Sequence, residues 1–123
     1  MKYLLIVLGG GAGSLTRFLV STAIVARYGN RFPMAGTMAI NISGSFVIGI
    51  LMTLITERFD PTSNLRPLLV IGFLGGYTTF SSFEWETYFS VRSGAPWMAI
   101  VNVAGSVVLG YLAVWLGAML ARR

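Results

Sequence analysis

The sequence predicts an all-α integral membrane protein because the chain is apolar, poor in charge, and contains long stretches with no charge at all. Of 123 residues, 55% are hydrophobic and 11% are charged, whereas a soluble domain carries about 25% charged residues. A spanning helix needs about 20 mostly apolar residues, and Phe32–Thr56 and Ser93–Ala121 each supply them without a charge. We expect one domain over residues 1–123 with four spans, roughly 4–26, 32–56, 67–90 and 95–120. These spans leave no room for an enzyme core.

The first span combines a glycine cluster with one charge. Its glycines loosely resemble a dinucleotide-binding fingerprint, but they lie in an apolar helix and no acidic residue follows before Glu57. We therefore expect them to contact a neighbouring helix closely. Arg17 stays charged within this span, so it either reaches to an interface or meets water or a partner. It could pair with Glu84 or Glu86, and both interpretations stay open.

The second and fourth spans each carry a stripe of small and polar residues at a spacing of four, which places each stripe on one helix face. In the second span the stripe is Thr37, Asn41, Ser45 and Gly49; in the fourth it is Asn102, Ser106 and Gly110. Close helix packing in lipid explains such stripes without any further function. The two carboxamides also favour a polar path, because an amide in hydrocarbon needs a partner, water or an ion.

The third span contains residues that predict a break in its helix. The run Gly75-Gly76-Tyr77-Thr78-Thr79 joins two poor helix formers to a β-branched pair, so the helix from Pro67 is predicted to open within this run, with a new helix near Thr79. Freed carbonyls could bind a small cation, and freed amides could face an anion. Phe80 and Phe83 then share one face, flanked by Ser81 and Ser82. Their positive ring edges could guide an anion, although ordinary packing explains the two rings equally well.

The charges leave the orientation in the membrane almost undecided. If the spans alternate, one side receives five of the nine basic residues and the other receives three, with Arg17 inside a span. Such a weak bias permits insertion both ways up, or a single orientation set by two charges. The basic residues are spread over loops and ends, so nucleic acid is not predicted as a partner. Without cysteine or histidine, the chain has no thiolate metal site and no residue that normally titrates near neutrality.

Three segments of this chain resemble the Fluc (CrcB) family of fluoride channels. They run from Gly9 to Phe18, from Gly36 to Gly49 and from Gly72 to Phe83. The resemblance covers essentially the whole chain, and the third segment is its most specific part. The chain departs from the family at Ser82, where threonine is common, and at Phe18, where tyrosine is frequent. Some relatives also carry hydroxyl residues where Asn102 and Gly110 lie.

The resemblance implies a dual-topology antiparallel homodimer with two fluoride pores and a structural sodium ion at the dimer centre. It implies that the sodium ligands are the carbonyls of Gly75 and Thr78 from each subunit. The pore residues expected in this way are Phe80, Phe83, Asn41, Ser106, Ser81 and Ser82. Residues expected to line a vestibule or to support the pore are Arg17, Glu86 and Asn102.

The function expected from this resemblance is passive, fluoride-selective efflux across the bacterial inner membrane, which protects the cell from fluoride that enters as the weak acid. An inside-negative potential favours anion exit by about 2.3 kcal/mol per 100 mV, so neither a pump nor an enzymatic activity is required. The alternative is a small four-helix multidrug exporter, which would need a buried glutamate in its first helix, where this chain has Arg17. A non-conducting scaffold subunit is a third possibility, although unwound backbone serves no purpose in a scaffold.

Overall fold

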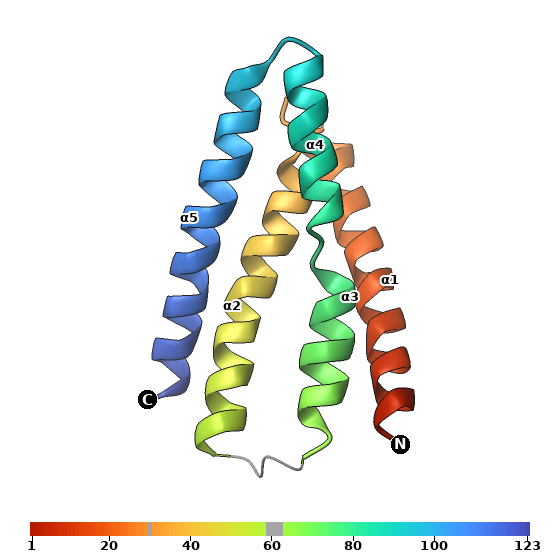
Figure 1. The fold of residues 1–123 in the computed structure, drawn as a ribbon, viewed down its shortest axis with the longest axis vertical. Helices are drawn as coiled ribbons and strands as arrows, with labels where there is room; N and C mark the ends of the chain where they lie inside the picture. The colour runs from red at the N-terminus through yellow and green to blue at the C-terminus, as the bar shows by residue number, and fades with distance from the viewer. Residues whose placement is uncertain (30, 59–62) are drawn as a thin grey trace.

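The computed structural model describes residues 1–29, 31–58 and 63–123 of the chain. These residues form four helical rods that run side by side, with both termini at the same end (Figure 1). Three rods are continuous helices: α1 (Lys2–Tyr28), α2 (Ala35–Glu57) and α5 (Pro96–Ala121). The third rod is composite, and its parts are the π-helix η1 (Arg66–Leu74), α3 (Gly75–Tyr77) and α4 (Ser81–Arg92).

The three continuous helices are each long and apolar enough to cross a membrane. The mean hydropathy of their most apolar windows is 1.6 in α1 and 2.0 in both α2 and α5. Residues 32–34, which the sequence placed at the start of the second span, instead form a turn that holds Pro33 before α2 begins. Together with the composite rod, these helices give the all-helical membrane architecture that the composition predicts.

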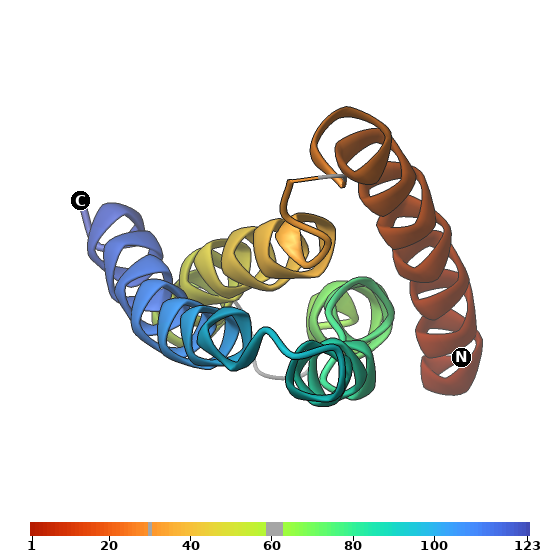
Figure 2. The same ribbon diagram turned by 90° about the horizontal axis from the view of Figure 1, so that it is seen from above.

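The rods form an open row in which α1 and α5 lie at opposite ends (Figure 2). The long helices α2 and α5 pack against each other, and α1 packs against η1 and α3. After the break the composite rod changes its neighbour, because α4 packs against α5. Large apolar side chains cover the outer faces of α1 and α5, for example Phe18 and Trp115. Lipid is the natural environment for such faces.

Glycines bring α1 and the composite rod into close backbone contact. A Cβ atom on Gly9 would overlap the Leu68 carbonyl oxygen, and one on Gly13 would overlap the Phe73 carbonyl oxygen. A Cβ atom on Gly76 would meet the carbonyl oxygen of Gly10 in the same way. The close helix contact predicted for the glycine cluster is therefore confirmed.

The helix break lies within the predicted run of residues 75–79, at its threonine end. Gly75 and Gly76 remain helical in α3, and the chain becomes extended only at Thr78, with φ −80° and ψ 158°. The threonine ends the helix by bonding twice to one acceptor, since its N–H and its hydroxyl both donate to the Leu74 carbonyl oxygen at 2.9 Å. Gly76 serves the contact with α1, and Thr78 ends the helix.

Candidate functional site

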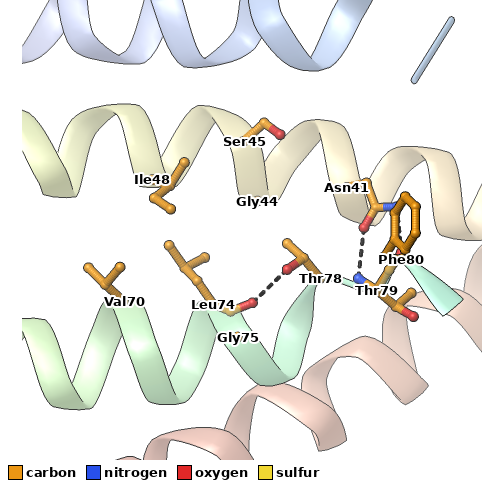
Figure 3. A pocket seen from close by; sticks show the side chains of 10 residues that line it. All are labelled: Asn41, Gly44, Ser45, Ile48, Val70, Leu74, Gly75, Thr78, Thr79 and Phe80. Atoms are coloured by element: carbon orange, nitrogen blue, oxygen red, sulfur yellow. Dashed lines mark hydrogen bonds between the residues drawn. The ribbon is translucent and has the colours of Figure 1, made fainter. Parts of the chain in front are cut away.

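The break is held open by one side chain from α2. The Nδ2 group of Asn41 donates to the Thr79 carbonyl oxygen at 2.9 Å, and the Thr79 N–H donates to Asn41 Oδ1 at 2.9 Å (Figure 3). The carboxamide thus satisfies both backbone groups of the residue at the centre of the unwound segment, which would otherwise be costly in hydrocarbon. The resemblance implies that Asn41 is a pore residue, and in this chain its carboxamide braces the break.

Thr79 joins the break to the helix that follows. Its Oγ1 donates to Ser82 Oγ at 3.1 Å and accepts from the Ser82 N–H at 3.3 Å. This contact satisfies one of the free N–H groups at the start of α4, as a capping side chain does. The sequence analysis did not select Thr79 as a site residue. The signal was present, because a hydroxyl residue three positions before the second serine is a common capping pattern.

A groove opens between α2 and the composite rod beside the break. Its volume is about 370 Å³. The walls of this junction groove combine amide, hydroxyl and backbone groups with apolar side chains (Figure 3), and its lining residues are Asn41, Gly44, Ser45, Ile48, Val70, Leu74, Gly75, Thr78, Thr79 and Phe80. Gly44 allows the two helices to approach here, because a Cβ atom on it would overlap the Thr78 methyl group.

The two phenylalanines that follow the break have different surroundings. Their ring centroids lie 5.8 Å apart at an interplanar angle of 38°. Phe80 borders the junction groove and is 73% exposed, whereas Phe83 is only 8% exposed. Within one chain, therefore, the Phe80 ring is open to its surroundings, and Phe83 is largely covered by its own helices.

A second, smaller hollow lies on the α1 side of the break and has a volume of about 240 Å³. Five hydroxyl residues and one guanidinium line this arginine hollow; its residues are Ser14, Arg17, Phe18, Ser21, Thr37, Ile40, Thr79 and Ser82. Arg17 Nη1 donates to the Thr78 carbonyl oxygen over 3.4 Å. A fixed positive charge among hydroxyl donors favours an anion. Arg17 thus faces a polar hollow beside the break.

Arg17 does not pair with either glutamate of α4. Among the described residues the ion pair present joins Arg122 and Glu57 at the end of the rods. Glu86 Oε1 instead accepts a hydrogen bond of 2.6 Å from the Thr37 hydroxyl, so this carboxylate ties α4 to α2. Its other oxygen is buried and has no hydrogen-bond partner within the described part of the chain. Glu84 is exposed.

A polar cluster on α5 clamps the start of α4. Asn102 is fully buried, and its Nδ2 donates to Thr87 Oγ1 at 3.0 Å and, more weakly, to the Phe83 carbonyl oxygen at 3.5 Å. The Ser106 hydroxyl donates in turn to Asn102 Oδ1 at 3.4 Å. These contacts set the position of Phe83 relative to α5. Asn102 and Ser106 do not line the junction groove.

The carbonyls of Gly75 and Thr78 suit a small hard cation. In an α-helix the Gly75 carbonyl would accept from the Thr79 N–H, but that N–H donates to Asn41. The extended backbone of Thr78 turns its carbonyl out of the helical pattern, and this oxygen already lies beside the Arg17 guanidinium. Carbonyl oxygens freed at a helix break are the usual ligands for sodium in a membrane protein. The Gly75 carbonyl therefore fits the ion that the resemblance implies, whereas the Thr78 carbonyl would bind it only in place of its contact with Arg17.

Apart from Ser81 and Glu86, the candidate residues fall into three groups within one chain. Asn41, Gly75, Thr78 and Phe80 meet at the junction groove, and Arg17 and Ser82 meet at the arginine hollow. Phe83, Asn102 and Ser106 form the third group, where α4 meets α5. Ser81 is exposed and lines neither hollow. Thr79 lines both hollows, so the junction groove and the arginine hollow lie on either side of this one residue.

Apolar helices around a braced helix break, with polar hollows on both of its sides, define a multi-pass helical membrane protein with irregular backbone between its helices. The chain belongs to the family described as "CrcB-like protein, Camphor Resistance (CrcB)", which matches residues 4–118. This family is one of ion channels and not of enzymes.

Curated relatives align with the whole chain. A protein of Solibacter usitatus is 65% identical over 123 residues, which is all of both chains. Proteins of Coxiella burnetii and Acidobacterium capsulatum are 46% and 43% identical, and each alignment covers all of this chain and 99% or 98% of the relative. All three relatives are named "Fluoride-specific ion channel FluC".

Proposed function

We propose that this protein is a fluoride-selective channel that lets fluoride leave the cell passively. The observation that carries the proposal is the full-length, 65% identity to a protein named as a fluoride-specific ion channel. The braced break supports it, because irregular backbone at membrane depth is tolerated where it lines an aqueous path or an ion site. The multidrug exporter gains no support, since α1 carries Arg17 and no glutamate or aspartate.

The path uses weak ligands for a small anion. Ring edges of Phe80 and Phe83, together with nearby hydroxyl and amide hydrogens, offer partial positive charge without a full cation in contact with the ion. Binding of this kind is strong enough to admit a dehydrated anion and weak enough to release it. Asn41 contributes with the Nδ2 hydrogen that its bond to Thr79 leaves over, since an amide nitrogen carries two.

The functional unit is an antiparallel homodimer. One chain leaves Phe80 exposed and divides its site residues among three groups, so a second copy is needed to enclose a path. The near balance of basic residues on the two sides permits both orientations. Tags on the termini should be reached from both sides of the membrane in one population, and access from a single side would exclude this arrangement.

A sodium ion at the dimer centre has a structural role. The Gly75 and Thr78 carbonyls of each copy would hold it, since one chain supplies only two such ligands. The ion would supply fixed positive charge between the two copies. Replacing sodium with N-methylglucamine should slow fluoride efflux and shift the purified dimer toward monomer. An unchanged dimer and unchanged efflux would remove sodium from the proposal.

The site of action is the inner membrane of a bacterium, where an inside-negative potential favours anion exit. The test is fluoride efflux from liposomes that contain the purified protein and sodium. Efflux should occur without a proton gradient, and chloride should stay inside. Retained fluoride would reject the channel, and transport of organic cations would indicate the exporter.

Phe80→Ile and Phe83→Ile test the path itself, because isoleucine keeps the bulk and removes the positive ring edges. Each change should reduce fluoride efflux by at least about tenfold, the loss of about 1.4 kcal/mol of favourable interaction at the barrier. Size-exclusion chromatography should show an intact dimer for both variants. Normal efflux in both would show that the rings serve only in packing.

A further inference from the structure

We propose that the hollow between the first turns of α1 and η1 binds the headgroup of an anionic phospholipid. Its volume is about 420 Å³, and its lining residues are Lys2, Tyr3, Ile6, Ser63, Arg66, Pro67 and Ile71. The first turns of α1 and η1, which form this basic hollow, lie at the end of the rods where both termini are found (Figure 1). It shares no lining residue with the junction groove or the arginine hollow.

The charge of the basic hollow matches a phosphate. Lys2 comes from α1 and Arg66 from η1, so the two positive side chains approach from different helices, and no acidic residue is among the lining residues. A guanidinium can bind two phosphate oxygens at once, and an ammonium adds a point charge. At the same end, Arg122 is engaged by Glu57 at 3.2 Å. Lys2 and Arg66, unlike Arg122, have no carboxylate beside them among the residues that line the hollow.

The hydroxyl of Ser63 adds an unmet hydrogen-bonding group. Its oxygen is buried and has no partner within the described residues. Buried polar groups in native proteins nearly always have a partner, and one without it calls for a ligand or water. A phosphate oxygen held by Lys2 and Arg66 would accept the hydrogen of this hydroxyl.

The rest of the basic hollow is apolar, which distinguishes a lipid from free phosphate. Ile6, Pro67 and Ile71 continue the wall toward the middle of the rods, and Ile71 is 51% exposed. Tyr3, 86% exposed, stands at the rim, where aromatic residues with a polar tip occupy the membrane interface. A headgroup at the charged end and an acyl chain along the isoleucines would use both parts.

The experiment measures lipid retained by the full-length protein. Purified protein is mixed with phosphatidylglycerol or phosphatidylcholine, and bound lipid is counted by native mass spectrometry. The double variant Lys2→Gln/Arg66→Gln should retain at least about tenfold less phosphatidylglycerol than the wild type, since each basic residue near an anionic surface contributes about fivefold. Ser63→Ala should lower retention by about twofold to fivefold, because it removes one hydrogen bond to a charged group.

The matched control is Arg58→Gln/Arg123→Gln, which removes the same charge at the same end without touching the hollow. It should change retention by less than twofold. Equal losses in both double variants would show general surface attraction and overturn the site, as would equal retention of phosphatidylcholine by the wild type. Displacement of the lipid by excess inorganic phosphate would show that the ligand is a free anion. Fluoride efflux of the variants provides an independent check that they fold.

Discussion

The two halves of the composite rod are held in different ways. Before the break, η1 and α3 lie against α1 with backbone against backbone, and Gly9, Gly13 and Gly76 allow the close approach. After the break, α4 lies against α5, and the contact includes a buried polar clamp from Asn102 to Thr87. The first interface depends on the absence of side chains, and the second depends on a particular side chain.

This difference shows what the break does for the fold. A continuous helix would keep one neighbour along its length, whereas the extended Thr78 lets the rod leave α1 and join α5. Asn41 stabilises the point of transfer by bonding both backbone groups of Thr79. The same unwinding frees backbone carbonyls and creates the two polar hollows. The change of neighbour from α1 to α5 and the candidate site therefore have one cause.

Gly13→Leu should have the largest effect, because the glycine interface has no space for a side chain. Even a Cβ atom at this position would overlap the Phe73 carbonyl oxygen, and backbone cannot move aside cheaply. We expect a loss of about 3 kcal/mol in the free energy of unfolding. Chemical unfolding of the purified protein in detergent measures it.

Gly11→Leu is the matched control for this prediction. A Cβ atom on Gly11 meets no atom within 4 Å, so the variant should stay within about 0.5 kcal/mol of the wild type. Equal losses at the two positions would mean that a bulky side chain on the lipid-facing surface, and not the close approach, lowers the stability.

Asn41→Asp should have the next largest effect, and it acts at the junction between the two halves. A carboxylate oxygen would replace the Nδ2 group and face the Thr79 carbonyl oxygen, which then loses its donor. We expect a loss of about 2 kcal/mol in stability together with reduced fluoride efflux, since the new negative charge repels the anion. Unfolding curves and liposome efflux measure the two effects separately.

Ser45→Ala is the control on the same stripe of α2. Ser45 lines the junction groove one turn away from Asn41, and its replacement should change stability by less than about 0.5 kcal/mol. If Asn41→Asp were as stable as this control, the carboxamide would not brace the break, and the transfer between neighbours would need another cause.

Asn102→Ala tests the polar clamp of the second half. The substitution removes the donor to Thr87 Oγ1 and leaves a cavity at a fully buried position. The free energy of unfolding should fall by about 1.5 kcal/mol, which thermal unfolding in detergent can resolve. Ser106→Ala should cost less, because its bond to Asn102 is long at 3.4 Å. A larger loss of stability for Ser106→Ala than for Asn102→Ala would mean that the bond from Asn102 to Thr87 is not the main polar contact between α4 and α5.

Most of the architecture could be predicted from the sequence, because helices that span a membrane are recognised by their apolar composition and their length. It also singled out Asn41 and Arg17, since polar or charged residues within apolar helices are conspicuous, and the structure places both beside the break. It placed the break within residues 75–79 but not at the threonines in particular, because Gly75 and Gly76 are poor helix formers, and only the structure shows that both stay helical, with Gly76 packed against α1. The bonds from Thr37 to Glu86 and from Asn102 to Thr87 join different helices. Spacing within one helix cannot reveal such pairs.

Ser14→Ala should have the smallest effect, and it asks whether polar contacts matter on the glycine side at all. The Ser14 hydroxyl reaches the Gly76 carbonyl oxygen at 3.5 Å from an exposed position, which is at the limit of a hydrogen bond. Thermal unfolding should therefore differ from the wild type by less than about 0.3 kcal/mol. A loss as large as that of Asn102→Ala would mean that side chains hold both halves of the rod. The glycines of α1 would then permit the contact without being its main source of stability, and the contrast between the two interfaces would have to be given up.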